Sequence, residues 1–192
     1  AASLSESCTL PFLAVCVFVL ALLVFYCVRG WNKRPEPAAK PVKAHKACLW
    51  ITLGLTAAFF LFAAAWTVGR VHSFRAPTFE FGIFSQMFYY LKESGLPMTT
   101  VERDGLLSHF AVHVSPIYYL MLPFYLLVPT PATLQVLQAA ALAFAVLPLW
   151  KLGKHHGLTG SQRMLLCALL LLYPAYSGGI SYALHENCFL TP

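Results

Sequence analysis

The chain has 192 residues, of which 59% are hydrophobic and 10% charged, and its mean hydropathy is +0.68. A soluble domain carries charge on about 25% of its residues. The composition therefore excludes a soluble globular domain, a disordered tail and a secreted disulfide scaffold, and it predicts an integral membrane protein. The formal net charge is +6, but no basic stripe interleaved with aromatic residues is present, so the sequence does not indicate nucleic-acid binding.

Four runs without a formal charge are each long enough to cross a bilayer. About 20 residues of α-helix reach roughly 30 Å, the thickness of the hydrocarbon core. Because every backbone amide within lipid must be paired internally, these runs are expected to be helices. The predicted spans are Leu10–Val28, Cys48–Val68, Pro131–Trp150 and Met164–Leu184. The first run also has the length of a secretory signal, but its N-terminal flank has no Lys or Arg and no A-x-A site follows it.

Positive charge is concentrated in two short loops, Arg29–Ala47 and Lys151–Arg163, which hold nine of the 13 Lys and Arg residues. The positive-inside rule places both loops in the cytoplasm. The four spans then alternate in direction. This arrangement leaves the N-terminus, Arg70–Thr130 and the C-terminal tail outside.

One uncharged stretch, Val114–Trp150, is long enough to hold two spans. Its first part, Pro116–Val128, is short for a full crossing and contains Pro123, which removes an amide donor from a helix interior. If this part crossed the bilayer, the loop Lys151–Arg163 would lie outside, against the charge rule. We therefore predict a juxtamembrane helix at the outer interface, where its tyrosines suit the headgroup zone.

The segment Phe79–Ser94 predicts an amphipathic helix at the same interface. Its apolar positions recur every three or four residues, at Phe81, Phe84, Phe88 and Leu91. Glu80 stands at the start of this helix, where a carboxylate is electrostatically favourable and can serve simply as an N-terminal stabiliser. The alternative is a general base held at the membrane surface in a partly apolar setting.

The segment Thr99–Pro116 carries a further group of ionisable residues. If it is helical, His109 and His113 share one face. Two such histidines can ligate a metal, but the HExxH pattern is absent because the residues between them are FAV. Two other interpretations remain open: hydrogen-bonded interfacial histidines, or binding of an anionic headgroup or phosphate together with Arg75 and Arg103.

The tripeptide His185-Glu186-Asn187 directly follows the fourth predicted span. An ionisable pair at the mouth of an apolar span predicts a functional site, at which His185 and Glu186 would complete a metal site or contact a substrate. The alternative is a helix end exposed to water.

Several stretches of the chain carry a resemblance. They are FEFGIFSQMFYYLKESGLP, ERDGLLSHFAVHVSPIYYLMLPFY, LQVLQAAALAFAVLPLWKL, LYPA and HENCFLTP. Together they resemble a family of bacterial multipass membrane proteins that is defined only as a domain of unknown function, over roughly Arg70–Pro192. That family is in turn similar to the GT-C glycosyltransferases, polytopic enzymes that use polyprenyl-phosphate sugars.

The resemblance implies an all-α fold, a polytopic transmembrane helix bundle with juxtamembrane helices in its first outer loop. Residues 1–47 would form an N-terminal transmembrane helix and a basic cytoplasmic loop. Residues 48–192 would form the N-terminal part of a truncated GT-C-like membrane domain, with its outer loop at residues 69–130. A departure from the GT-C pattern is that Phe79-Glu80 replaces the usual paired Asp-Glu.

The implied activity is transfer of a sugar from a polyprenyl-phosphate donor at the outer membrane face. Glu80 would deprotonate the acceptor hydroxyl, and His185 and Glu186 would position the acceptor or a divalent cation. The donor phosphate would be held by Arg75, Arg103, His109 and His113. The expected partners are membrane lipids and no nucleic acid. The cofactor is unknown, and a divalent cation is one candidate. The rival interpretations are a non-catalytic transporter or lipid-binding protein, and a structural membrane subunit.

Overall fold

The computed structural model describes residues 21, 25, 46–76, 78–181 and 184. Nearly all of the first predicted span and of the basic loop that follows it lies outside these residues, as do His185 and Glu186. Apart from Ala21 and Phe25, the described residues belong to one compact unit that begins at Ala39.

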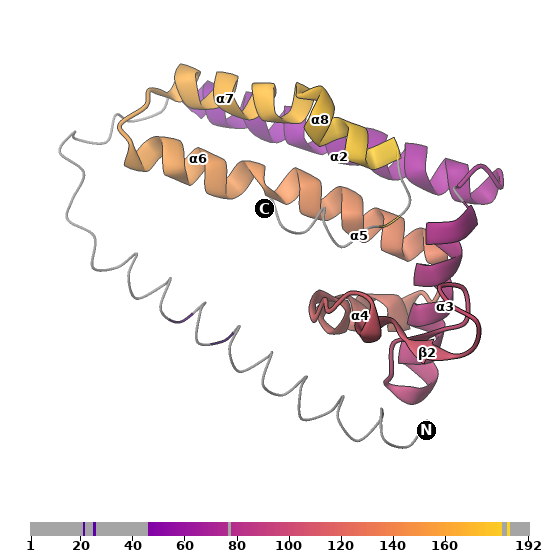
Figure 1. The fold of residues 1–192 in the computed structure, drawn as a ribbon. Coiled ribbons are helices and arrows are strands. Elements are labelled where there is room, and N and C mark those ends of the chain that lie inside the picture. Colours follow the sequence, from indigo (N-terminus) through magenta and orange to yellow (C-terminus); the bar gives the residue numbers. More distant parts are fainter. Residues whose placement is uncertain (1–20, 22–24, 26–45, 77, 182–183, 185–192) are drawn as a thin grey trace. The chain divides into compact units, whose positions relative to one another are not determined.

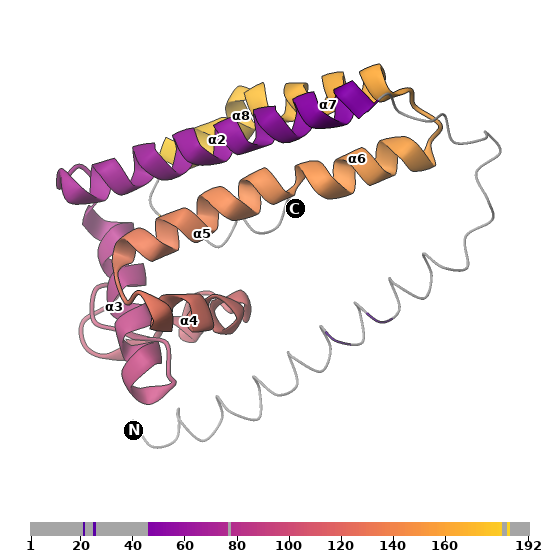
Figure 2. The ribbon, with the colours of Figure 1, turned by 180° about the vertical axis from the view of Figure 1, so that it is seen from behind.

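Long helices that lie side by side form what we call the long-helix layer (Figures 1 and 2). Helix α2 (Lys46–His72) packs against α5 (Pro131–Phe144) and α7 (Gly160–Leu172), and α6 (Val146–His155) packs against α7. Figure 1 shows α5 and α6 running opposite to α2, and α7 returning beside α2. The prediction of a mostly helical fold is confirmed.

Helices α5 and α6 follow one another with a break at Ala145. Pro148 has no backbone N–H and therefore interrupts the helical hydrogen bonds at this point. Side chains from the neighbouring segment bond to carbonyls near the break: the Tyr176 hydroxyl donates to the Leu142 oxygen at 2.6 Å, and the Cys167 thiol approaches the Val146 oxygen at 3.9 Å. The predicted third span begins where α5 begins, and the helix continues five residues beyond its predicted end.

The prediction of one helix over Met164–Leu184 is wrong. Helix α7 ends at Leu172, and a short α8 (Pro174–Ser177) and a 3₁₀ turn, η2 (Gly178–Ser181), follow it. Tyr173 has an extended conformation with ψ of 119°, because a residue that precedes proline avoids the helical region. The unbroken apolar composition of the run hid this break.

The turn between α6 and α7 is shorter than the predicted loop Lys151–Arg163, because helix occupies most of that segment. A capping box starts α7, in which Thr159 and Gln162 satisfy each other's backbone amides. Arg163, which was predicted to lie at the end of this cytoplasmic loop, is a buried residue of α7. Its Nε donates to the Leu158 oxygen at 3.1 Å, and its guanidinium lies 4.9 Å from the centre of the Trp150 ring.

The burial of side chains in α2 is the reverse of that in a helix of a soluble protein. Its buried residues are the small or polar Thr52, Ala63 and Thr67, whereas Trp50 is 70% exposed and Phe62 is 65% exposed. A helix in water would bury its large apolar side chains, so this pattern fits a lipid environment. By length and composition, α2 and the continuous segment formed by α5 and α6 can each cross a bilayer.

The rest of the unit, which we call the α3–α4 region, lies where α2 ends and α5 begins (Figure 1). It consists of α3 (Thr78–Ser94), β1 (Met98–Thr99), β2 (Leu107–Ser108), η1 (His109–Ala111) and α4 (Ile117–Leu127). With 11 residues, α4 is about 16 Å long, too short to cross a bilayer, as predicted for Pro116–Val128. The antiparallel pair β1–β2 corrects the prediction of a purely helical fold.

Candidate functional site

Helix α3 places Glu80 in its first turn, next to the positive end of the helix dipole. The side chain is half-buried. One face of α3 packs into the α3–α4 region and is formed by Ile83, Phe84, Met87, Phe88 and Leu91. The predicted apolar face is confirmed except at Phe81, which is half-buried, while Ile83 and Met87 are buried instead. This packing fixes the helix that carries Glu80.

The β1–β2 hairpin returns the chain over α3. Gln86 of α3 holds the start of the hairpin loop, because its Oε1 accepts from the Thr100 amide at 2.8 Å and from the Thr99 hydroxyl at 3.1 Å. Gly105 has φ of +117°, a conformation that L-residues with a side chain rarely adopt, and it lets the loop turn back into β2. As a result, Glu102 and Arg103 of this loop lie beside the first half of α3.

The central element of the site is a chain of hydrogen bonds from Glu102 through His109 to Tyr118. Nδ1 of His109 lies 2.8 Å from Oε2 of Glu102, and its Nε2 lies 3.2 Å from the Tyr118 hydroxyl. An ionised carboxylate can only accept, so Nδ1 donates to Glu102, and in the neutral ring Nε2 accepts from Tyr118. The Glu102 and His109 side chains are 8% and 2% exposed. The pair is therefore almost completely shielded from bulk solvent.

Backbone and ring contacts fix the His109 side chain further. Its amide donates to the Pro97 oxygen at 2.7 Å, and its ring centre lies 5.5 Å from that of Phe84. Phe84 and Phe88 also pack on Tyr118, at 6.1 and 5.9 Å between ring centres. The imidazole consequently has little freedom to turn.

The neighbouring tyrosine on α4 is directed elsewhere. The Tyr119 hydroxyl donates to the Gly95 oxygen at 2.9 Å. Burial raises the pKa of Tyr119, which keeps this phenol protonated and able to donate. Tyr119 therefore ties α4 to the end of α3, while Tyr118 serves the Glu102–His109 pair.

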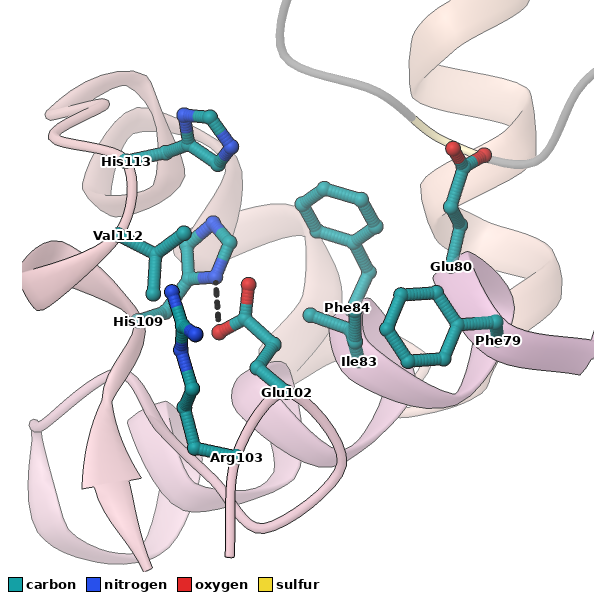
Figure 3. A pocket seen from close by; sticks show the side chains of 9 residues that line it. All are labelled: Phe79, Glu80, Ile83, Phe84, Glu102, Arg103, His109, Val112 and His113. Atoms are coloured by element: carbon teal, nitrogen blue, oxygen red, sulfur yellow. Dashed lines mark hydrogen bonds and ion pairs between the residues drawn. The ribbon is translucent and has the colours of Figure 1, made fainter.

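A cavity of about 240 Å³ opens in front of the Glu102–His109 pair. Its polar walls are formed by Glu80, Glu102, Arg103, His109 and His113, and its apolar walls by Phe79, Ile83, Phe84 and Val112 (Figure 3). Figure 3 shows Glu80 and Glu102 on opposite sides of the Phe84 ring. The cavity thus offers two carboxylates and one guanidinium beside an aromatic wall, a set of groups that can bind hydroxyls, bind an anion or accept a proton.

A family model, described as "Predicted membrane protein (DUF2079)", matches residues 70–192. The chain belongs to the DUF2079 family. No curated protein and no solved structure matches it. The matched part of this DUF2079 protein includes the whole α3–α4 region and with it all the described residues that line the cavity.

The family, together with the two long apolar helical segments, identifies this DUF2079 protein as a membrane protein. The exposed Trp50, Phe62 and Trp66 of α2 agree with this assignment, because lipid can cover them. The cavity lies in the region that joins the two segments, since α3 and α4 are located between α2 and α5 in the chain.

The DUF2079 cavity gathers four of the seven site residues predicted from the sequence, namely Glu80, Arg103, His109 and His113. His109 and His113 lie close together, with 5.8 Å between their ring centres, although the segment forms only a short 3₁₀ turn rather than the helix considered for it. Arg75 is exposed and does not line the cavity; its carbonyl accepts from Arg70.

Glu102 is the functional candidate that the sequence interpretation missed. The spacing of Glu102 and His109, seven residues apart across a hairpin, has no helical or strand periodicity that would pair them. The only available signal was the density of charge in the stretch from Glu102 to Asp104. Among the described residues, no group of three or more His, Cys, Asp or Glu side chains could hold a metal ion.

Proposed function

We propose that this DUF2079 protein is a multipass, membrane-embedded transferase of the GT-C type. It takes a sugar from a polyprenyl-phosphate donor and passes it to an acceptor hydroxyl at the non-cytosolic face. The observation that carries the proposal is the cavity that combines Glu80, the Glu102–His109 pair and Arg103 at one end of the long-helix layer. A donor dissolved in the membrane and a polar acceptor from solution meet at such a place.

The proposed orientation follows from the positive charges. The loops 29–47 and 151–163 face the cytoplasm, and the N-terminus and residues 69–130 lie outside. The antiparallel course of α2 and of α5 with α6 supports this proposal. Helix α2 ends and α5 begins at the same end of the long-helix layer, so residues 69–130 connect two helices on one side of the membrane. The described residues that line the cavity all belong to that segment.

In the proposed reaction, Glu80 removes the proton of the acceptor hydroxyl as its oxygen attacks the anomeric carbon of the donor. The bond from that carbon to the phosphate oxygen breaks, and the lipid phosphate leaves with the bonding electrons. Arg103 and His113 stabilise the charge of this phosphate from the cavity wall. His185 and Glu186 are proposed to position the acceptor or a divalent cation.

The test is sugar transfer by the full-length protein in proteoliposomes that contain a panel of radiolabelled polyprenyl-phosphate hexoses and pentoses. Glu80→Gln keeps the shape of the side chain but removes the base, and it is expected to lower turnover by about 10²–10⁴-fold. Glu93→Gln is the matched control, because Glu93 is exposed at the other end of α3 and pairs with Lys92 at 2.8 Å. Full activity of the Glu80→Gln protein would contradict the assignment of the base.

A second candidate is a non-catalytic transporter or lipid-binding protein. The apolar walls formed by Phe79, Ile83, Phe84 and Val112 favour it, because they suit a lipid headgroup or solute that is bound without reaction. The same vesicles separate the two functions. Movement of the labelled compound across the membrane without a new glycosidic product would support this candidate and exclude the transferase.

A further inference from the structure

The cavity contains a carboxylate whose position is fixed before any ligand arrives. Glu102 is held by His109, and His109 is held by the fully buried Tyr118. Oε2 bonds to His109, and Figure 3 draws the second oxygen of Glu102 between the His109 and Phe84 side chains. An acceptor that is pre-positioned in this way binds a hydrogen-bond donor with little loss of side-chain entropy.

The charges around the cavity select against an anion at its centre. Glu80 and Glu102 both line the cavity, and their two carboxylates repel an anion that enters it. Among the described residues that line the cavity, Arg103 is the only Lys or Arg. Neutral hydroxyl groups meet no such repulsion, because each can donate to a carboxylate oxygen and accept from the guanidinium.

The apolar walls and the size of the cavity limit the ligand further. The rings of Phe79 and Phe84 line it together with Ile83 and Val112, so a ligand with an apolar C–H face gains contact on that side. The volume of about 240 Å³ is below the range of roughly 300–1,000 Å³ that is usual for drug-sized ligands. A single six- or five-membered ring that carries several hydroxyls meets these requirements.

We propose that the cavity binds one monosaccharide ring, with Glu102 accepting its hydroxyl hydrogens and with His109 and Tyr118 as positioning residues. The inference rests on the proposed sugar transfer and specifies which part of the reactants occupies the cavity. The ring lies between Glu102 and the aromatic wall, and a lipid phosphate attached to it lies toward Arg103 and His113.

The experiment is saturation-transfer-difference NMR on the full-length protein in nanodiscs, with free aldohexoses and aldopentoses as probes. This measurement detects weak binding and does not depend on turnover, so it separates failure of this inference from failure of the proposed transfer. The wild-type protein is expected to saturate the ring protons of at least one sugar. With a disaccharide of that sugar, saturation is expected in one of the two rings.

Two pairs of variants assign the roles. Glu102→Gln is expected to weaken sugar binding about tenfold, since it removes a hydrogen bond to a charged group. Asp104→Asn is the control and is expected to leave binding unchanged, because Asp104 is an exposed acid of the same loop that does not line the cavity. Tyr118→Phe is expected to weaken binding about threefold. Its control, Tyr119→Phe, is expected to leave binding unchanged, because the Tyr119 hydroxyl bonds to Gly95 and not to His109.

The double variant Glu102→Gln/Tyr118→Phe shows whether Tyr118 acts through Glu102. If it does, Tyr118→Phe adds nothing once Glu102 has been replaced, whereas independent contributions would multiply. A wild-type protein that saturates none of the sugars overturns the inference, even if it transfers sugar. Equal binding by the Glu102→Gln and Asp104→Asn proteins overturns the role of Glu102.

Discussion

The long-helix layer and the α3–α4 region both bury polar side chains, but they satisfy them in different ways. In the layer, the hydroxyls of Thr52 and Thr67 donate to backbone carbonyls of their own helix, α2. In the α3–α4 region, the Glu102 and His109 side chains bond to each other across a hairpin. A hydroxyl bonded to its own helix can be lost with little consequence, whereas a buried carboxylate depends on its partner.

The two regions also differ in whether their buried polar groups can reach a ligand. The threonine hydroxyls of the layer donate to carbonyls of α2, and neither Thr52 nor Thr67 lines the cavity. The carboxylates and imidazoles of the α3–α4 region border that cavity, where a ligand can reach them. Of the two described sets of buried polar groups, the Glu102–His109 pair is the one that lies beside a cavity.

The largest expected effect on stability tests this difference directly. His109→Leu removes the partner of a Glu102 side chain that is 8% exposed, so we expect a loss of about 3 kcal/mol in the free energy of unfolding. Thr67→Val, in the long-helix layer, is expected to cost less than about 1 kcal/mol, because the carbonyl to which Thr67 donates lies within its own helix. Equilibrium unfolding in mixed micelles measures both changes.

The control for this prediction is the double variant Glu102→Leu/His109→Leu. Replacing a whole buried pair with apolar residues is often nearly neutral, so the double variant is expected to be more stable than His109→Leu alone. If the two variants are equally unstable, the loss comes from packing around the imidazole and the contrast between the regions disappears.

Within the layer, close packing rather than charge limits substitution. A Cβ at Gly153 would lie 2.8 Å from Cγ of Arg163, so Gly153→Ala is expected to cost about 2 kcal/mol by forcing the α6–α7 turn apart. Gly54→Ala is the matched control, since no described atom beyond its chain neighbours and its own helix backbone lies within 4 Å of a Cβ at that position. The same unfolding measurement compares them, and an equally stable Gly153→Ala protein would show that the turn yields easily.

The smallest expected effect lies where the two regions meet. After α3 and after α6, a glycine adopts the left-handed conformation, with φ of 73° at Gly95 and 74° at Gly157. After α2, the residue in this conformation is Phe74, with φ of 56°. Its side chain is 96% exposed. Phe74→Gly is expected to raise the free energy of unfolding by about 1 kcal/mol, because it removes backbone strain and no buried contact. Gly95→Ala introduces the same strain and is expected to have the opposite sign.

If Phe74→Gly instead lowers the free energy of unfolding in micelles, the exposed ring contributes apolar contact that outweighs the strain. The reversed sign would then assign Phe74 to the surface that detergent or lipid covers. The sign of the change therefore shows whether lipid or detergent covers Phe74, as we expect for the exposed side chains of α2.

The sequence was sufficient for features that depend on composition and local signals. Apolar runs predicted α2 and the α5–α6 segment. Helical spacing predicted α3, and a short apolar stretch bounded by prolines predicted α4, each to within one residue at both ends. The hydrogen-bonding needs of a backbone in lipid allow few alternatives for such runs. The break at Pro174 and the length of the α6–α7 turn were harder to predict, because hydropathy does not register proline geometry or a buried Arg163.

For the candidate site, the sequence alone indicated that ionisable groups gather between the second and third apolar runs, and it selected Glu80, Arg103, His109 and His113. Only the tertiary structure decided that these four residues border one cavity, that Arg75 does not, and that Glu102 belongs with them. The reason is physical: a helix or strand has a period that can be read from the chain, whereas the bond from Glu102 to His109 exists because a hairpin folds back over α3, and such long-range closure leaves no periodic trace.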